Sequence, residues 1–430
     1  MSQGWRTLGT VRRARSALII GALVVAVVVA LARANLAWLL GIVIFVLALL
    51  ISVMLHELGH FLTAKKFHMK VTQFFVGFGQ TLWSTMRGET EYGVKALPFG
   101  GFVKIVGMSS LEEVDEQDEP RTFRRQPAWQ RAVVLVAGSF MHFALAFVLL
   151  AGLALGIGVQ NTTVIGRIAS CVPASAKALD QGTCQGSLGR SPAAVAGIRA
   201  GDTVTKIGSR PVHTWVQLGE AIRVLPPGKP VPVVVKRDGV QHTLSLTPAA
   251  VPGRKGSFFG VDEKIFKRVG PITAVSYAGT QFGDVLASSG SAIAKLPSAL
   301  PDLFASDRAK TPAGNVSSVV GAADIAGQAV EQGGGWQFTV STLLLIVISL
   351  NIFVGAFNLL PLLPLDGGHL ALVIYEKIRS WLARLRRRPD PGLVDLEKLL
   401  PVSIGVFALL VGLAVVLIAA DIFNPIHLPQ

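Results

Sequence analysis

Long uncharged stretches are the feature of this chain that most constrains its fold. One of them, Leu36–Leu55, runs for twenty residues without a charged side chain. Twenty residues of α-helix rise about 30 Å, which matches the hydrocarbon core of a bilayer. Similar uncharged runs occupy residues 132–158, 338–360 and 402–420. The sequence therefore predicts an α-helical polytopic membrane protein.

A shorter apolar run, Ser16–Ala32, precedes these segments and follows a basic stretch. Its last three residues are typical of a signal-peptidase site, so the run is either a cleaved signal peptide or a retained span. We favour retention, because the next span begins almost at once. The expected count is about five transmembrane helices, or four after cleavage.

The net charge of +14 at pH 7 could indicate a nucleic-acid partner, but the pattern of charges argues against one. Only 15% of the residues are charged, against about 25% in a typical soluble domain. Basic residues instead flank the apolar runs, which indicates the cytoplasmic ends of membrane spans. These residues are Arg6, Arg12, Arg13, Arg15, Lys65, Lys66, Lys70, Arg384, Arg386, Arg387 and Arg388.

A metal-binding pattern closes the first long run. His56-Glu57-Leu58-Gly59-His60 follows directly after Leu55. On a helix, H-E-x-x-H sets two imidazoles on one face, where both can bind one Zn²⁺ ion beside a glutamate that can act as a base. The position of the motif predicts a zinc site that uses water at the inner boundary of the membrane.

A catalytic zinc site usually has a third protein ligand, and the fourth span supplies a candidate. Counting inward from Phe338 places Asn358 after about 30 Å of helix. Asp366 follows Pro361 and Pro364, which should stop the helix, and precedes two glycines that should turn the carboxylate back. The sequence predicts that Asp366 meets His56 and His60 at one depth.

The segments between the spans differ in composition and divide the chain into five parts. Short strands are expected at 71–78, 82–86, 90–97 and 101–106. A small α+β domain follows the third span, with strands expected at 164–165, 203–207, 231–235 and 243–246 and a helix at 216–224. Helices near 272–294 and a loose loop near 306–314 should connect that domain to the fourth span, and a basic loop should follow that span. The expected divisions are 1–35, 36–158, 159–252, 253–337 and 338–430.

Two cysteines, Cys171 and Cys184, lie in the α+β region. Two cysteines are too few for a Cys-rich zinc site. If the region lies outside the membrane they can form one disulfide, and two unpaired thiols are the alternative.

Several motifs resemble the site-2 protease family of intramembrane zinc metalloproteases, in particular the bacterial regulator-of-sigma-E branch. The matching stretches are HELGH at 56–60, Val76–Gly79, Gly88–Tyr92, Ala96–Lys104 and Asn358–Gly368. The resemblance implies that zinc is held by His56, His60 and Asp366, with Glu57 as the catalytic base.

The family resemblance also implies a membrane-associated β-hairpin. Unwound substrate backbone is costly in lipid unless it is paired, and an edge strand can pair with it. We expect the stretch from Val71 to Val106, with Gly100 and Gly101, to supply that edge. Asn358, beside Pro361 and Pro364, could also hold the unwound segment. The alternatives are an ordinary connector and a helix-end cap.

The chain departs from the family at one motif. Family members commonly carry Gly-Pro-x-x-Asn in the next span, whereas this chain has Gly138-Ser139-Phe140-Met141-His142. A polar side chain deep in an apolar helix is a candidate active-site group. His142 therefore either donates to the substrate backbone or oxyanion, or is satisfied by a neighbouring helix.

The stretch Ser191–Val204 resembles a bacterial PDZ domain. PDZ grooves take a peptide as an added strand, often by its C-terminal carboxylate. Exclusion of bulky substrates is the equal alternative for this domain.

Together these features predict a protease of a bacterial inner membrane that cuts pre-trimmed membrane proteins in or near transmembrane segments. The resemblance implies anti-sigma factors and remnant signal peptides as substrates. The PDZ-like domain is expected outside the cytoplasm and the active site near the cytoplasmic face, with no nucleic-acid partner. A non-proteolytic zinc transporter or membrane chaperone is the rival, which the glutamate beside the histidines disfavours.

Overall fold

A computed structural model describes most of the chain. The described residues are 35–108, 112–158, 163–180, 184, 186–213, 215–253, 256–263, 268–305, 308, 311, 316–331, 336–395 and 397–426. The first apolar run, 16–32, and most of the predicted loop near 306–314 lie outside them. The described chain forms two compact units, one of Ala151–Tyr277 and one of the remaining residues.

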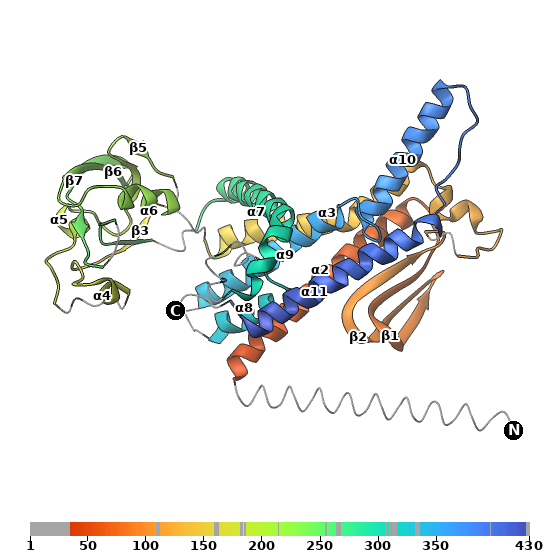
Figure 1. The fold of residues 1–430 in the computed structure, drawn as a ribbon, viewed down its shortest axis with the longest axis horizontal. Coiled ribbons are helices and arrows are strands. Elements are labelled where there is room, and N and C mark those ends of the chain that lie inside the picture. The colour runs from red at the N-terminus through yellow and green to blue at the C-terminus, as the bar shows by residue number, and fades with distance from the viewer. Residues whose placement is uncertain are drawn as a thin grey trace. The chain divides into compact units, whose positions relative to one another are not determined.

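Four helices in the described part of the chain are long and apolar enough to cross a membrane. They are α2 (Leu36–Lys66), α3 (Ala128–Gly156), α9 (Trp336–Asn358) and α11 (Leu400–Phe423) (Figure 1). The four long runs in the sequence are thus confirmed as helices. Their large apolar side chains are often exposed, as on Leu40, Leu47 and Ile51, because a helix that is apolar all round faces lipid.

Helix α8 (Val319–Glu331) packs closely along the first turns of α2. A Cβ on Gly41 of α2 would lie 2.3 Å from the carbonyl oxygen of Ala326, so only glycine permits this approach. The Trp38 indole donates a hydrogen bond to Asp324 Oδ1 at 3.0 Å. Small residues at such crossings let membrane helices pack backbone to backbone.

Two long, bent strands follow α2. Strand β1 (Val71–Arg87) and strand β2 (Thr90–Ile105) form one antiparallel sheet, drawn in orange in Figure 1. Phe74 pairs with both Tyr92 and Val103, because the two halves of β2 lie on opposite sides of the first half of β1. The four predicted short strands are therefore halves of two long ones, and the segment Gly101–Ile105 forms an edge of the sheet.

The segment after Asp366 differs from the expectation. The sequence predicts a basic loop there, whereas the structure has a helix, α10 (Asp366–Leu385). Leu370 and Val373 pack into a core with Met69 and Val71, and that burial stabilises the helix. The basic residues that suggest a loop, such as Lys377 and Arg384, are exposed on α10 or lie beyond its end.

Connecting helices complete the first unit. Helix α7 (Pro271–Ala299) confirms the predicted helix near 272–294, and a 3-10 turn at Leu300–Phe304 follows it. Short 3-10 turns also lie at Glu119–Arg121, Phe123–Arg125 and Glu397–Leu399.

The second unit is built around a four-stranded antiparallel sheet in the order β5-β4-β6-β7. Its core includes Ile165, Val204, Leu218 and Val233. The strands and helix expected near 203–207, 231–235, 243–246 and 216–224 are present. The elements are β3 (Ile165–Ile168), α4 (Ala176–Asp180), α5 (Pro192–Val195), β4 (Thr203–Ile207), β5 (Arg210–Pro211), α6 (Trp215–Arg223), β6 (Val231–Arg237), β7 (Val240–Leu246), β8 (Ala249–Ala250), β9 (Ser257–Phe258) and β10 (Val261–Glu263).

Two further links hold this unit together. Strand β10 pairs with β3, so the unit continues beyond Pro252. Cys171 and Cys184 form a disulfide, which decides between the two alternatives left open by the sequence.

Candidate metal centre

The two histidines of the motif lie on one face of α2, because the helix continues without a break through residues 56–60. His56 is 8% exposed and His60 is 5% exposed. Their Nε2 atoms are 3.1 Å apart. Two imidazoles therefore point at one small volume inside the first unit.

Asp366 closes this group from a distant part of the chain. Its Oδ2 atom lies 3.4 Å from His56 Nε2 and 3.3 Å from His60 Nε2. Helix α9 ends at Asn358, and the stretch with Pro361 and Pro364 leads into α10, whose first residue is Asp366. The structure thus brings the three side chains together, as the sequence predicts.

The donor atoms fit a zinc ion. Tetrahedral ligands at about 2.0–2.1 Å from zinc are separated from each other by roughly 3.3 Å, which matches the three spacings. Asp366 Oδ2 is buried without a hydrogen-bond partner among the described residues. His60 Nδ1 lies 2.7 Å from the carbonyl oxygen of Val134, so it donates its hydrogen there and leaves Nε2 free for a metal.

A glycine of α3 makes room for the two imidazoles. A Cβ on Gly138 would lie 2.4 Å from His60 Nε2 and 2.5 Å from His56 Cε1. Any larger residue at this position would push the rings apart. The backbone of α3 thus forms one wall of the site.

The glycines after Asp366 act differently from the expectation. They lie inside the first turn of α10 and do not turn the chain back. A Cβ on Gly367 would lie 2.3 Å from the carbonyl of Leu359, and one on Gly368 would lie 2.6 Å from that of Leu362. Their role is close packing of α10 against the segment that ends α9, which fixes the position of Asp366.

Glu57 points from α2 toward the sheet. Its Oε2 accepts a hydrogen bond of 3.0 Å from the backbone N–H of Val103, on the edge segment of β2. Gly101 is buried against α2, where a Cβ would lie 2.5 Å from Met54 Sδ, and Gly100 has a φ of +97°. These two glycines bring the edge of the sheet beside the motif.

His142 lies beside the metal ligands. Its ring centroid is 5.0 Å from that of His56, and its Nδ1 is 2.7 Å from Asn351 Oδ1. Sequence reasoning missed Asn351, although an asparagine in the middle of an apolar span is itself a signal.

The remaining predicted residues lie at the end of α9. Asn358 is its last residue and is half-buried, while Pro361 and Pro364 are exposed after it. The helix ends before both prolines, as their chemistry requires.

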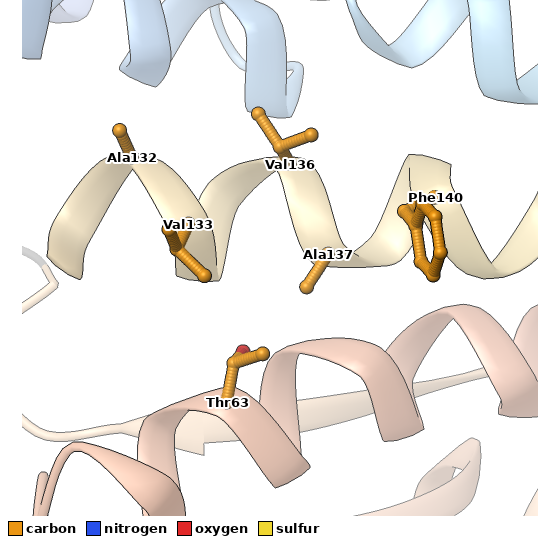
Figure 2. A pocket seen from close by; sticks show the side chains of 6 residues that line it. All are labelled: Thr63, Ala132, Val133, Val136, Ala137 and Phe140. Carbon is orange, nitrogen blue, oxygen red and sulfur yellow. The ribbon is translucent and has the colours of Figure 1, made fainter. Parts of the chain in front are cut away.

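An apolar groove lies between α2 and α3, apart from the three candidate ligands. It has a volume of 380 Å³ and is lined by Thr63 of α2 and five residues of α3 (Figure 2). No titratable side chain is among the lining residues. The groove therefore offers apolar contact and no catalytic group. The five residues of α3 are Ala132, Val133, Val136, Ala137 and Phe140.

Comparison with known proteins agrees with this geometry. The model of peptidase family M50 matches residues 44–388. The chain belongs to this site-2 protease family. It is 39% identical over 413 residues to the zinc metalloprotease Rip1 of Mycobacterium tuberculosis, covering 91% of this chain and 99% of Rip1. Rip1 of Mycolicibacterium smegmatis is 38% identical, with the same coverage of both chains. The metalloprotease MmpA of Caulobacter vibrioides is 28% identical over 78% of this chain and 85% of its own.

Membership of family M50 decides the class of activity. The chain is a zinc metalloprotease of the membrane, and its metal is Zn²⁺. The rival interpretation, a transporter or chaperone without proteolytic activity, is excluded by these relatives.

Proposed function

We propose that this M50 protease cuts peptide bonds in or near transmembrane segments, with zinc held by His56, His60 and Asp366. The observation that carries the proposal is the set of three donor atoms at mutual distances of 3.1–3.4 Å. A zinc ion held there supplies an acidified water and a Lewis acid for the scissile carbonyl.

Glu57 is the proposed general base. It follows the first ligand directly, and its carboxylate is held by Val103 N–H at the edge of the sheet. In that position it can take the proton from the attacking water and return it to the leaving amine. Its orientation by a backbone group keeps the carboxylate next to the site while leaving its second oxygen available.

Substrate capture is proposed for the edge segment Gly101–Ile105 of β2. An unwound substrate must pair its backbone groups in the membrane, and this edge lies beside Glu57. Gly100 and Gly101 allow the close approach of the strand to α2. Asn358, with Pro361 and Pro364, could hold the other side of the substrate segment at the end of α9.

The second unit is the proposed PDZ-like domain. We place it outside the cytoplasm of a bacterial inner membrane, because the basic residues flank the opposite ends of the spans. It either captures a peptide C-terminus or excludes bulky proteins. Pre-trimmed anti-sigma factors and remnant signal peptides are the proposed substrates.

The first test of this proposal uses purified protein and a model transmembrane peptide. Glu57→Gln should retain one zinc per chain but lose cleavage by at least about 10³-fold, since it removes the base and spares the ligands. His56→Ala should lose both zinc and cleavage. Zinc content by mass spectrometry and product formation with and without a chelator are the measurements. Normal cleavage by Glu57→Gln would refute the proposed role of this residue.

A second test identifies substrates. Cells that carry only the Glu57→Gln protein should accumulate uncut membrane fragments, which quantitative proteomics of membranes can name. Accumulation of anti-sigma factor or signal-peptide fragments would support the proposed substrate classes. Accumulation of other proteins alone would contradict them.

A further inference from the structure

Three buried polar residues from three helices meet beside the metal ligands. They are Ser52 of α2, His142 of α3 and Asn351 of α9, each between 1% and 3% exposed. Polar groups in such a setting persist only when they are hydrogen-bonded, and they commonly mark functional positions. The proposed catalytic steps use neither Ser52 nor Asn351.

The directions of the hydrogen bonds in this cluster are fixed by backbone carbonyls. Asn351 Nδ2 lies 2.8 Å from the carbonyl oxygen of Val347 and 3.0 Å from Ser52 Oγ. A carbonyl can only accept, so the amide nitrogen of Asn351 must face it. The Ser52 hydroxyl donates to the carbonyl of Ala48 at 2.9 Å and is therefore free to accept from Asn351.

This arrangement determines the tautomer of His142. Asn351 Oδ1, the atom left for His142, is an acceptor, so His142 Nδ1 carries the hydrogen at 2.7 Å. In a neutral imidazole the other nitrogen then has a lone pair and no hydrogen. His142 Nε2 can therefore accept a hydrogen bond but cannot donate one.

The neighbouring metal ligand, His56, has a ring nitrogen that lacks a hydrogen-bond acceptor. His56 Nδ1 is buried and has no hydrogen-bond partner among the described residues. A metal-bound histidine almost always donates this second N–H, as His60 does to Val134. Gly138, one helical turn before His142, lies against His56, because its Cβ would be 2.7 Å from His56 Nδ1. The His142 ring lies on the same helix as Gly138 and is centred 5.0 Å from the His56 ring, so the unsatisfied donor and both rings lie where α2 meets α3.

We infer that His142 is a positioning residue for His56. Its Nε2 accepts the Nδ1–H of His56, directly after a small side-chain shift or through one water, and Asn351 holds His142 in the tautomer that can accept. The inference rests on the proposed function, since it requires His56 to be a zinc ligand. Of the two alternatives that the sequence leaves open for His142, it builds on the contact with a neighbouring helix and not on donation to the substrate.

Zinc affinity is the measurement that tests this inference, and competition with a chromogenic chelator gives it directly. His142→Phe keeps a ring but removes the acceptor, so the affinity should fall about 10–100-fold. His142→Asn retains an amide oxygen that can accept and should stay within a few-fold of the parent protein. Ser139→Ala is the matched control, because this buried hydroxyl on the same helix has no hydrogen-bond partner within the described chain.

Coupling between the two residues tests the role of Asn351. Asn351→Leu should weaken zinc binding by no more than His142→Phe does, and the double variant should bind zinc no more weakly than His142→Phe, because Asn351 acts only through the acceptor that His142 supplies. Thermal unfolding of the zinc-free proteins separates this effect from a folding defect. A purely structural role would lower the unfolding temperature and leave the zinc affinity unchanged.

Two outcomes would overturn the inference. One is an unchanged zinc affinity in His142→Phe. The other is a double variant whose zinc affinity is lower than that of His142→Phe by the full factor that Asn351→Leu causes alone. Tight zinc binding by His56→Ala would refute the proposed ligand set and this inference together. Cleavage by Glu57→Gln would refute only the proposed base, because the zinc affinities would still stand.

Discussion

Single residues in this protein act mainly by being small or by being polar at defined places. Gly138 shows the first case, since its missing side chain is the space that the two histidine rings occupy. Asp366 shows the second, because one carboxylate oxygen faces both imidazoles. At the residue scale the site is therefore defined as much by the α3 backbone as by the ligands.

Gly138→Ala provides a prediction at this scale. The new methyl group would contact His60 Nε2 and His56 Cε1, so we expect zinc binding to weaken at least about 10-fold, with a matching loss of cleavage at limiting zinc. Gly152→Ala on the same helix is the control, because a Cβ there meets nothing within 4 Å. Metal analysis after dialysis measures both, and equal zinc content in the two variants would contradict the prediction.

Residue types that carry chemistry were predictable, whereas their supporting contacts were not. The spacing of His56 and His60 on a helix and the length of the fourth span were enough to bring Asp366 to them. Nothing local in the sequence indicates that Gly138 lies against the rings or that Asn351 bonds His142. Those contacts depend on how α3 and α9 pack, and helix packing is set by the whole unit.

At the scale of elements, an ion-pair cluster ties three segments together near the C-terminal end of α2. Glu89, in the turn between β1 and β2, accepts from Lys65 at 2.8 Å and from Arg121 at 2.7 and 2.8 Å. The hydrogen bonds from Arg121, supported by Lys65, lower the pKa of Glu89 from 4.5 to about 2 despite partial burial. The turn of the hairpin is thereby fixed to the end of the helix that carries the motif.

The pH dependence of this cluster follows from the direction of the shift. Because the folded pKa of Glu89 is lowered, its contribution to stability is present above pH 4.5 and is lost as the pH falls toward 2. Glu89→Gln should lower stability at pH 7 by about 1 kcal/mol or less, since the partners are partly exposed. It should also flatten the acid dependence of the unfolding temperature in this window.

Glu116→Gln is the control for that measurement. Glu116 is exposed and forms no ion pair with another described residue. Its unfolding curve in detergent should follow that of the parent protein at each pH. An unchanged acid dependence in Glu89→Gln would show that the cluster contributes nothing to folding.

Elements were predictable where one periodicity dominated. The four long apolar runs became helices at nearly the expected residues. The strands of the hairpin were located correctly but appeared as four, because Gly77, Gly79 and Gly100 bend two long strands without ending them. Helix α10 was missed, since charged residues interrupt its second half and follow its end, and only the packing of its buried side reveals it.

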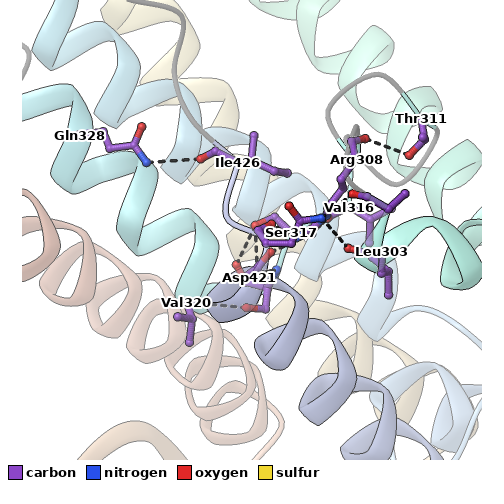
Figure 3. A network of polar contacts seen from close by, with 12 residues as sticks. Leu303, Arg308, Thr311, Val316, Ser317, Val320, Gln328, Asp421 and Ile426 are labelled. Atoms are coloured by element: carbon purple, nitrogen blue, oxygen red, sulfur yellow. Dashed lines mark hydrogen bonds and ion pairs between the residues drawn. The ribbon is translucent and has the colours of Figure 1, made fainter.

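At the scale of the first unit, a buried ion pair joins the connecting segment to the last helix. Arg308 and Asp421 are each 2% exposed at the side chain and lie 2.8 Å apart (Figure 3). Asp421 also accepts from the backbone N–H of Ser318, and Arg308 donates to the carbonyls of Val316 and Asn424. This network fixes the end of α11 to a segment more than one hundred residues earlier.

Asp421→Ala should therefore be strongly destabilising. It leaves Arg308 buried without its counter-charge, which costs about 3–5 kcal/mol. Lys398→Ala removes the exposed pair with Asp395 near the other end of α11 and should cost less than about 1 kcal/mol. Thermal unfolding in detergent compares the two. Equal stability of both variants would contradict the larger contribution to the free energy of unfolding that we assign to the buried pair.

The hydrogen bond between Val103 and Glu57 has a consequence for the order of events. A backbone amide serves one strong acceptor at a time, and the amide that restrains the base belongs to the strand proposed to receive the substrate. A guest chain that pairs at Val103 must compete with the carboxylate for this hydrogen. Pairing of a guest chain at Val103 would therefore release Oε2 of Glu57, so docking and a change in how the carboxylate is held would occur in one step.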